Sequence, residues 1–331
     1  MNQMHSDARV SIAGRSPGLR PESVEAVVTV PTFRRPEHLL ATLESLARQM
    51  TDRHYAVIVV ENDAERCEGA EAALPLFEAG LLQGLVIIAH QRGNCSAYNA
   101  GWLTALRNFP NLQHLLVIDD DEIADPHWLE RMCRASEALG ADIVGGPQLP
   151  VFASPDHARW AAHPVFSPPY RETGLVPALY SSGNLLVGRQ VLDRMGPPFL
   201  DLGFNFIGGG DSDFLSRSAA AGFRLGWCAE AVVREAVPAR RVEADWIRAR
   251  SLRNGVISTL VEKRKRANDP LGRAKVFAKS LALLAASPVR AALRLARGDA
   301  QSALYPVYVA LGRVGAEFGY ANEQYRTPEK N

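Results

Sequence analysis

The sequence has few cysteines, and none of the four forms a CxxC pair: they are Cys67, Cys95, Cys133 and Cys228. This spacing argues against a zinc knot or a disulfide framework and favours a reducing cytosol. The phosphate-binding patterns GxxxxGKS/T and GxGxxG are also missing, which excludes P-loop and Rossmann cradles. The apolar runs are shorter than the roughly 20 residues that a membrane-spanning helix needs. The polar residues 1–22 lack the apolar core of a secretory signal.

The composition is that of an ordinary globular protein. The chain has 331 residues, of which 47% are hydrophobic and 22% charged, and this allows one large domain or two of average size. Short apolar runs alternate with stretches of helical spacing, which predicts βαβ units and a parallel sheet covered on both faces. The expected strands are 24–31, 55–60, 85–89, 115–118, 143–144 and 180–187. The expected helices are 37–50, 68–79, 96–108, 126–139, 189–195 and 211–222.

The charge is distributed unevenly along the chain. Residues 247–331 carry 16 basic and 6 acidic side chains, whereas residues 1–246 carry 21 basic and 30 acidic ones. An acidic body with a basic tail suggests that the tail meets an anionic partner, such as a membrane face or a phosphate-bearing ligand, although a solvated helical surface has the same composition. Nucleic acid is not expected, because the acidic body would repel its backbone and no reader motif is present.

The basic tail is expected to form two helices, at 243–266 and 272–297. In the second helix, apolar residues alternate with Lys and Arg, which is typical of a helix that lies on an anionic membrane. A helical cap packed on the sheet, or a dimer interface, would give the same pattern. Before the tail, residues 147–180 contain seven prolines and Trp160, and this long irregular segment is of the kind that often carries function.

Polar residues follow the expected strands, where ligands bind in open α/β sheets. The most acidic of these ends is Asp119-Asp120-Asp121, directly after strand 115–118. In an extended segment, Asp119 and Asp121 would face one side and Asp120 the other. Carboxylates suit hard cations such as Mg²⁺ or Mn²⁺, so one aspartate could bind a metal and the other a ribose. A solvated acidic turn or a capping cluster remains the alternative.

A second acidic pair, Asp211 and Asp213, follows the glycine run 208–210. Glycine lets the backbone approach a ligand closely, and Asp211 would lie at a helix N-terminus, where a negative charge is favoured. Asp211 is therefore either a general base at the mouth of a site or simply the cap of its helix.

Taken in order, these motifs resemble family 2 glycosyltransferases of the GT-A fold. The pieces that carry the resemblance span about residues 25–240 and are VVTVPTFRRPEHLLATLESL, VIVVEND, RGNCSAYNAG, LLVIDDDE, SSGNLLV and GGGDSDFLSRSAAAGFRLGW. Together with VVREAVPARR and WIRARSLRNG, they are similar to bacterial enzymes that build exopolysaccharides on lipid carriers.

The resemblance implies an α/β GT-A fold with a mostly parallel central sheet flanked by helices and with a basic helical extension. It also implies a division of the chain. A flexible arm would cover 1–23, and a catalytic domain 24–242, with a nucleotide-sugar half at 24–146 and an acceptor half at 147–242. The basic helical region would cover 243–331.

The implied activity is inverting transfer of a sugar from a nucleotide-diphosphate sugar, a UDP-hexose first of all. The acceptor would be a saccharide or a polyprenyl-diphosphate-linked saccharide, in surface polysaccharide synthesis at the cytoplasmic face of the plasma membrane. Such a displacement needs a base for the acceptor hydroxyl and a cation, Mg²⁺ or Mn²⁺, for the departing diphosphate. A nucleotidyltransferase, or a catalytically impaired relative that binds sugar nucleotides, is the alternative.

The resemblance also assigns roles to individual residues. The general base would be Asp211, and the metal ligands Asp121 and Asp119. The nucleotide-binding residues would be Pro31, Thr32, Arg34, Glu61, Asn62, Arg92, Asn99, Asp119 and Asp120. The acceptor-binding residues would be Trp160, Gly183, Asn184, Gly209, Gly210 and Asp213.

The chain departs from the family pattern at four places. Gly210 replaces the usual Glu before the base, Tyr98 stands where Arg is common, and Glu61 where Asp is usual. No His occupies the expected third metal-ligand place, and Glu235 is the nearest polar candidate.

Overall fold

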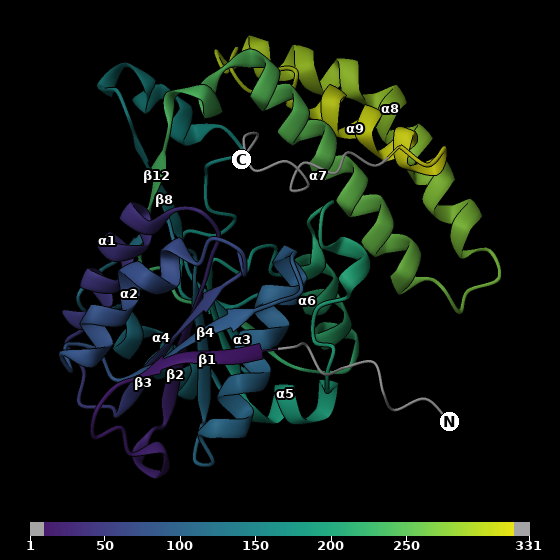
Figure 1. The fold of residues 1–331 in the computed structure, drawn as a ribbon. Coiled ribbons are helices and arrows are strands. Elements are labelled where there is room, and N and C mark those ends of the chain that lie inside the picture. Colours follow the sequence, from purple (N-terminus) through teal and green to yellow (C-terminus); the bar gives the residue numbers. More distant parts are fainter. Residues whose placement is uncertain (1–9, 321–331) are drawn as a thin grey trace. The chain divides into compact units, whose positions relative to one another are not determined.

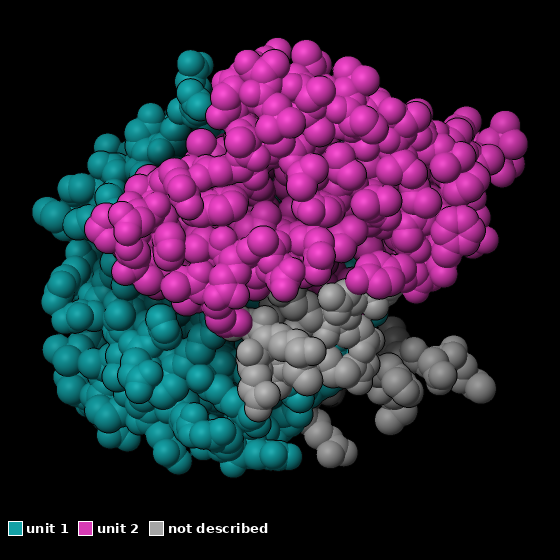
Figure 2. All heavy atoms as spheres, turned by 90° about the horizontal axis from the view of Figure 1, so that it is seen from above, with its two compact units in different colours: residues 1–148, 170–206, 210–235 teal, residues 149–169, 207–209, 236–331 magenta. Residues whose placement is uncertain are grey.

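The computed structural model describes residues 10–320, which fold into two compact units. The first unit contains 10–148, 170–206 and 210–235, and the second contains 149–169, 207–209 and 236–320 (Figure 2). Most of the proline-rich segment 147–180 belongs to the second unit. The expected division at 146 and 242 into a nucleotide-sugar half, an acceptor half and a basic tail stays a prediction.

Four parallel strands form the centre of the first unit, in the order β4-β3-β2-β5 (Figure 1). They are β2 (Ala26–Thr32), β3 (Tyr55–Glu61), β4 (Gly84–Ala89) and β5 (His114–Ile118). Their Val, Ile and Leu side chains are nearly all buried, as expected for strands covered on both faces. The crossovers run through α1 (Pro36–Ala47), α2 (Glu68–Glu78) and α3 (Asn94–Asn108). The expected βαβ arrangement is confirmed here.

The remaining strands make this a mixed sheet of nine. On one side, β1 (Val10–Arg15) pairs antiparallel with β4, and on the other, β10 (Asn184–Gly188) pairs antiparallel with both β5 and β7 (Ile143–Gly145). Beyond β7 lie β11 (Leu225–Trp227) and β9 (Gly174–Leu175). The flexible arm expected at 1–23 is wrong for 10–15, because β1 satisfies the otherwise open edge of β4; residues 1–9 lie outside the described part.

Three further helices belong to the first unit: α4 (Trp128–Leu139), α5 (Arg189–Met195) and α6 (Gly210–Ala220). A small sheet has the order β6-β12-β8, from β6 (Glu122–Ala124), β12 (Val233–Val237) and β8 (Gln148–Phe152). Short 3-10 turns cover Pro21–Ser23, Pro155–Ala162, Leu202–Phe204 and Ala239–Val242. Strand β6 begins directly after the aspartate triplet.

The second unit is built around α7 (Ala244–Lys265), α8 (Gly272–Ala296) and α9 (Tyr305–Glu317). Helices α7 and α9 approach each other through glycines. An added Cβ at Gly255 would lie 2.1 Å from the Val309 carbonyl oxygen, and one at Gly312 would lie 2.0 Å from the Leu252 carbonyl oxygen. The two expected tail helices are confirmed as α7 and α8, whereas α9 was not expected.

Helix α8 is unusually apolar for a surface helix. Among the described residues it is the one helix whose length and composition would allow it to cross a membrane, and only 22% of its apolar window is buried. The short apolar runs of the sequence did not predict this, because isolated Lys, Arg, Ser and Pro residues interrupt each run.

The α7–α9 contact gives a stability prediction. Replacing Gly312 with Ala should destabilise the protein by about 1–3 kcal/mol, because the new methyl group meets the backbone of α7. Gly315→Ala on the same helix is the matched control, since its Cβ would meet only Tyr320 at an ordinary 3.4 Å. The control should be neutral or slightly stabilising, because Ala is the better helix former. Chemical denaturation of both variants checks this; equal stabilities would contradict the close approach.

Candidate active site

The carboxyl ends of β2 and β5 bring Thr32 and the aspartate triplet together. The Thr32 hydroxyl donates a hydrogen bond of 2.8 Å to Oδ2 of Asp120. Asp120 is buried, and burial raises its pKa to about 6 although the nearby Arg35 opposes this shift. The predicted division of the triplet therefore holds for Asp120, which points inward while Asp119 and Asp121 are half-buried.

Helix α1 and β6 fix the backbone of the acidic turn. The Thr42 hydroxyl lies 3.0 Å from the Asp120 carbonyl oxygen and 2.7 Å from that of Glu122. In return, the Glu122 carboxylate accepts a hydrogen bond of 3.0 Å from the Asp119 N–H. The turn is thus held rigid by side chains from both of its flanks, so its carboxylates have defined positions before any ligand arrives.

Tyr98 on α3 contacts the first aspartate directly. Its hydroxyl donates to Oδ1 of Asp119 at 2.6 Å. Burial, followed by the negative charge of Asp121, raises the pKa of Asp119 to about 7 despite this bond. The residue that replaces the family's usual Arg therefore supplies a neutral donor where the family commonly has a cation.

Arg35 engages the other end of the triplet. Its guanidinium lies 2.9 Å from Oδ2 of Asp121 and 3.4 Å from Oδ1 of Asp120. The Asp121 side chain is 11% exposed, so it can still be reached from outside the fold. Arg35 was not among the predicted site residues, although its position in the PTFRRP motif was a signal.

The donor set of this turn fits a hard divalent cation. In the described part of the chain, no three His, Cys, Asp or Glu side chains converge as a ready-made metal cage. Mg²⁺ and Mn²⁺ are commonly held by one or two carboxylates together with substrate phosphates, and Asp119 and Asp121 supply two such carboxylates. The backbone of Gly183 leaves room beside them, because an added Cβ would lie 2.8 Å from Oδ2 of Asp119. We therefore find that the residues present fit the predicted ion.

Asp211 lies in the first turn of α6, in electrostatic range of Tyr98. Its carboxylate accepts a hydrogen bond of 2.7 Å from the Ser212 N–H. After burial, which is the main cause, the Asp211 charge contributes to the raised pKa values of Cys95 and Tyr98. Since the Tyr98 hydroxyl bonds to Asp119, Asp211 and the acidic turn belong to one neighbourhood.

The unusual Gly210 has a steric explanation. A Cβ at this position would lie 2.4 Å from the Cys95 sulfur, 3.5 Å from Cβ of Phe204 and 3.6 Å from Cδ2 of Leu200. The family's usual Glu has no room here because the Cys95 thiol fills the space. Gly210 is thus one half of a packing pair, and its predicted acceptor contact could be made only through its backbone.

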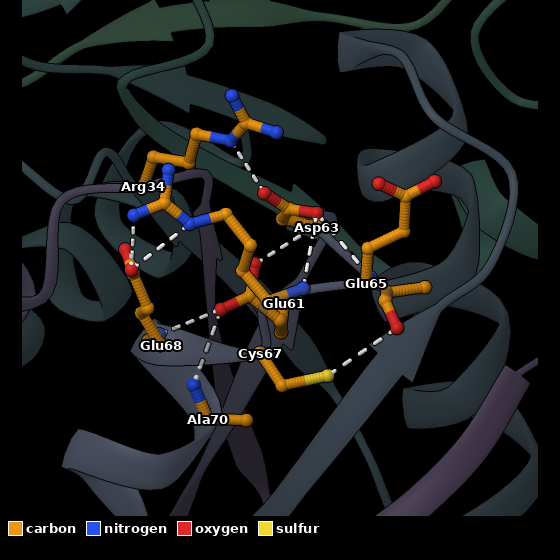
Figure 3. Close-up of polar contacts among 10 residues, drawn as sticks. Arg34, Glu61, Asp63, Glu65, Cys67, Glu68 and Ala70 are labelled. Carbon is orange, nitrogen blue, oxygen red and sulfur yellow. Dashed lines mark hydrogen bonds and ion pairs between the residues drawn. The ribbon is translucent and has the colours of Figure 1, made fainter.

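The end of β3 forms a second polar cluster (Figure 3). The Glu61 carboxylate is fully buried and accepts hydrogen bonds from the N–H groups of Asp63, at 2.7 Å, and of Gly69 and Ala70, at 2.7 and 3.2 Å. Burial raises its pKa, although these bonds oppose the shift. Glu61 therefore caps the N-terminus of α2, and its side chain does not present the free carboxylate that a nucleotide contact predicted from it would need.

Arg34 lies above the same cluster. Its Nε is 2.5 Å from Oδ2 of Asp63, and this ion pair lowers the pKa of Asp63 although burial opposes it. The guanidinium groups of Arg34 and Arg92 each lie 5.0 Å from the centroid of the Phe33 ring. Phe33 was not predicted as a site residue, yet it holds two predicted nucleotide-binding arginines beside it.

Four other predicted residues have their side chains bonded within the fold. The Asn62 side-chain NH₂ donates to the carbonyl oxygens of Ala89 and Gln91, and its oxygen accepts from the Gly93 N–H. The Asn99 side-chain amide donates to the Leu200 carbonyl oxygen and accepts from the Leu200 N–H. The Asn184 side-chain oxygen accepts a hydrogen bond from the Trp128 ring N–H, and its NH₂ group donates to the carbonyl oxygens of Pro147 and Ala231. The Asp213 carboxylate forms an ion pair with Arg217 at 2.8 Å. All four are buried. These contacts make them supports of the site loops and not open binding groups.

Of the last three predicted residues, one adjoins Thr32 and two belong to the second unit. Pro31 is on β2, directly before Thr32. Trp160 and Gly209 belong to the second unit. The ring centroids of Trp160 and His163 are 5.6 Å apart. Gly209 has a φ of +92°, and an added Cβ there would lie 2.5 Å from Cγ2 of Ile257. The acidic turn belongs to the first unit, so the acceptor contacts of Trp160 and Gly209 stay predictions.

Comparisons with known proteins identify the family of the chain. The pattern of the family described as "Glycosyl transferase family 2" matches residues 27–196. The chain is 30% identical, over 240 residues, to the succinoglycan biosynthesis protein ExoM of Rhizobium meliloti (strain 1021), covering 71% of this chain and 74% of that one.

Two solved structures have the same fold at low identity. The mannosyltransferase PcManGT from Pyrobaculum calidifontis, in complex with GDP-Man and Mn²⁺, has a TM-score of 0.58 at 18% identity and covers 94% of this chain and 91% of its own. Staphylococcus aureus TarS 1–349, in complex with UDP, has a TM-score of 0.50 at 13% identity and covers 90% and 91%. With the acidic turn and the α6 carboxylate in place, the chain belongs to glycosyl transferase family 2 and has the GT-A fold.

Proposed function

We propose that this glycosyltransferase moves a sugar, with inversion, from a nucleotide-diphosphate sugar to a saccharide in bacterial surface polysaccharide synthesis. The observation that carries the proposal is the proximity of two distinct groups of carboxylates. Asp119 and Asp121 line a preformed acidic turn, and Asp211, at the start of α6, lies within electrostatic range of Tyr98, whose hydroxyl bonds to Asp119. A single displacement requires this division, because the leaving diphosphate needs a cation, whereas the incoming hydroxyl needs a base that accepts its proton.

In this proposal, Asp211 accepts the proton of the acceptor hydroxyl as that oxygen attacks the anomeric carbon. Its position at the N-terminus of α6 keeps the carboxylate near backbone N–H groups, of which the Ser212 N–H holds one oxygen. Asp119 and Asp121 would hold the divalent ion, Mg²⁺ or Mn²⁺, which supplies charge compensation for the diphosphate. Arg34, Arg92 and Thr32 are at the edge where the nucleotide would lie.

The donor is proposed to be a UDP-sugar, with GDP- and other nucleotide sugars as alternatives. Structures of similar fold were solved with UDP and with GDP-Man and Mn²⁺, which supports a nucleotide sugar and a divalent ion in general. The relative named for succinoglycan biosynthesis supports an exopolysaccharide product.

The alternative of an impaired relative rested on Gly210 and Tyr98. Each of these departures has a partner: Gly210 makes room for Cys95, and Tyr98 donates to Asp119. Substitutions that are matched by their neighbours favour an adapted site over a decayed one. A nucleotidyltransferase would need the acidic turn as well, but it would have no use for a base on α6.

The same proposal places the protein at the cytoplasmic face of a membrane, next to a lipid-linked acceptor. Helix α8 buries Val276, Ser280 and Ala291 against its own unit, while Phe277, Leu281, Val289, Leu293 and Leu295 are 38–64% exposed. Exposed apolar side chains on a helix that also carries Lys and Arg fit the surface of an anionic bilayer.

The two groups of carboxylates can be tested separately. With nucleotide sugars and Mn²⁺, Asp211→Asn should keep donor binding, measured by thermal shift, and lower nucleotide release by about 10²–10⁴-fold, because a general base is lost. Asp121→Asn should instead remove the Mn²⁺-dependent thermal shift. Asp193→Asn is the control, since its side chain on α5 is 54% exposed and pairs only with Arg189 on the surface. Unchanged turnover in Asp211→Asn would remove that residue as the base.

Membrane association can be tested without deleting a helix, since deletion would uncover the residues that α8 buries. The double variant Leu281→Gln, Val289→Gln should bind phosphatidylglycerol vesicles about tenfold more weakly, because two apolar side chains no longer enter the bilayer. Met50→Gln with Leu81→Gln is the matched control, two equally exposed apolar residues of the first unit. Vesicle sedimentation measures both, and equal losses would contradict a role for α8.

A further inference from the structure

Four arginines surround a pocket that the reaction described above does not use. The pocket lies within the second unit, between α8 and α9, and has a volume of about 350 Å³. This lies in the range of roughly 300–1,000 Å³ typical of small-ligand sites. Arg290 and Arg294 come from α8, Arg297 directly follows its last residue and Arg313 comes from α9, and no acidic side chain lines the pocket.

The arginines are only partly neutralised. Arg294 pairs with Asp299 at 3.0 Å, and Arg313 pairs with Glu262 at 2.8 Å. The single carboxylate of Glu262 also serves Lys279 and Arg266. Within residues 10–320, Arg290 and Arg297 take part in no ion pair. The pocket therefore carries an excess of positive charge, which an anionic ligand would compensate.

Arg313 adds an independent indication. Its side chain is only 3% exposed, and two of its nitrogens bond to Ser258 and Glu262. Its Nε has no hydrogen-bond partner among the described residues. A buried donor without an acceptor is costly, and a phosphate oxygen in the pocket would satisfy it.

The rest of the lining is apolar, and this narrows the ligand further. Leu293 and Val309 line the pocket, and Leu293 is also 51% exposed on the apolar face of α8. A ligand with a charged head and an apolar chain could thus place its head among the arginines and its chain along Leu293. Free phosphate or a nucleic acid would use only the first of these features.

We propose that this pocket binds the diphosphate head of a membrane-borne prenyl lipid. This inference rests on the proposed function, because it names the lipid anchor through which the acceptor saccharide would be carried. The planar guanidinium of arginine can donate two parallel hydrogen bonds to phosphate oxygens, which makes arginine well suited to bind a diphosphate. Helix α8 would hold the pocket at the bilayer surface.

The test compares two double variants of the full-length protein on phosphatidylcholine vesicles that contain geranylgeranyl diphosphate. Arg290→Gln with Arg297→Gln should weaken vesicle binding about tenfold or more, because charge-assisted contacts to phosphate are lost. Arg273→Gln with Lys275→Gln removes the same charge from α8 outside the pocket lining and should have little effect. Vesicles in which phosphatidylserine supplies an equal charge should bind the unchanged protein more weakly.

Three results would overturn the proposal. Equal losses in both variants, or equal binding to phosphatidylserine vesicles, would mean that only general surface charge acts. If inorganic pyrophosphate in solution binds as tightly as the vesicle-borne diphosphate, the ligand is a free anion. Nucleotide release by the unchanged protein with a soluble saccharide acceptor is measured separately, so the proposed function and the lipid pocket can fail independently.

Discussion

The burial of several carboxylates in one turn is the constraint on which the site depends. Asp119, Asp120 and Glu122 all have raised pKa values, and burial is the first cause in each case. Like charges in a poorly solvated place repel each other strongly, so the turn is stable only because neighbours hold it. Thr32, Thr42, Tyr98 and Arg35 are these neighbours. A divalent ion that binds together with a diphosphate would compensate this negative charge, so the repulsion within the unliganded turn favours binding of the ion.

The support of the site loops comes largely from residues inside the motifs themselves. Glu61 caps α2, Asn62 joins two loops, and Asn99 holds the backbone at Leu200. Each is a buried polar group with its hydrogen bonds satisfied inside the fold, which makes it costly to replace. A motif of this family thus mixes residues that face a ligand with residues that fix the loop shape, and only the coordinates separate the two.

This mixture explains how far the sequence could predict the protein. The parallel strands were predictable, because short runs of β-branched residues such as VIVV are typical of strands covered on both faces. The place of the acidic turn followed from the strand before it. Strand β1 and helix α9 were not predictable, since β1 depends on a partner edge 70 residues away and α9 contains Pro306 and two glycines. The roles of Glu61 and Gly210 depend on contacts across the chain that no local pattern records.

In the proposed function, the two units would serve ligands of opposite character. The first unit would offer carboxylates and arginines to a soluble, charged donor, whereas the second would offer apolar side chains and arginines to a lipid. A donor reaches its site by diffusion through water, but an acceptor on a lipid carrier is confined to the membrane plane. An enzyme held at that plane meets such an acceptor at a much higher effective concentration than one in solution. In the proposed function, the basic, apolar tail would therefore raise turnover without contacting the reacting atoms, which would be a reason for a compact catalytic fold to carry it.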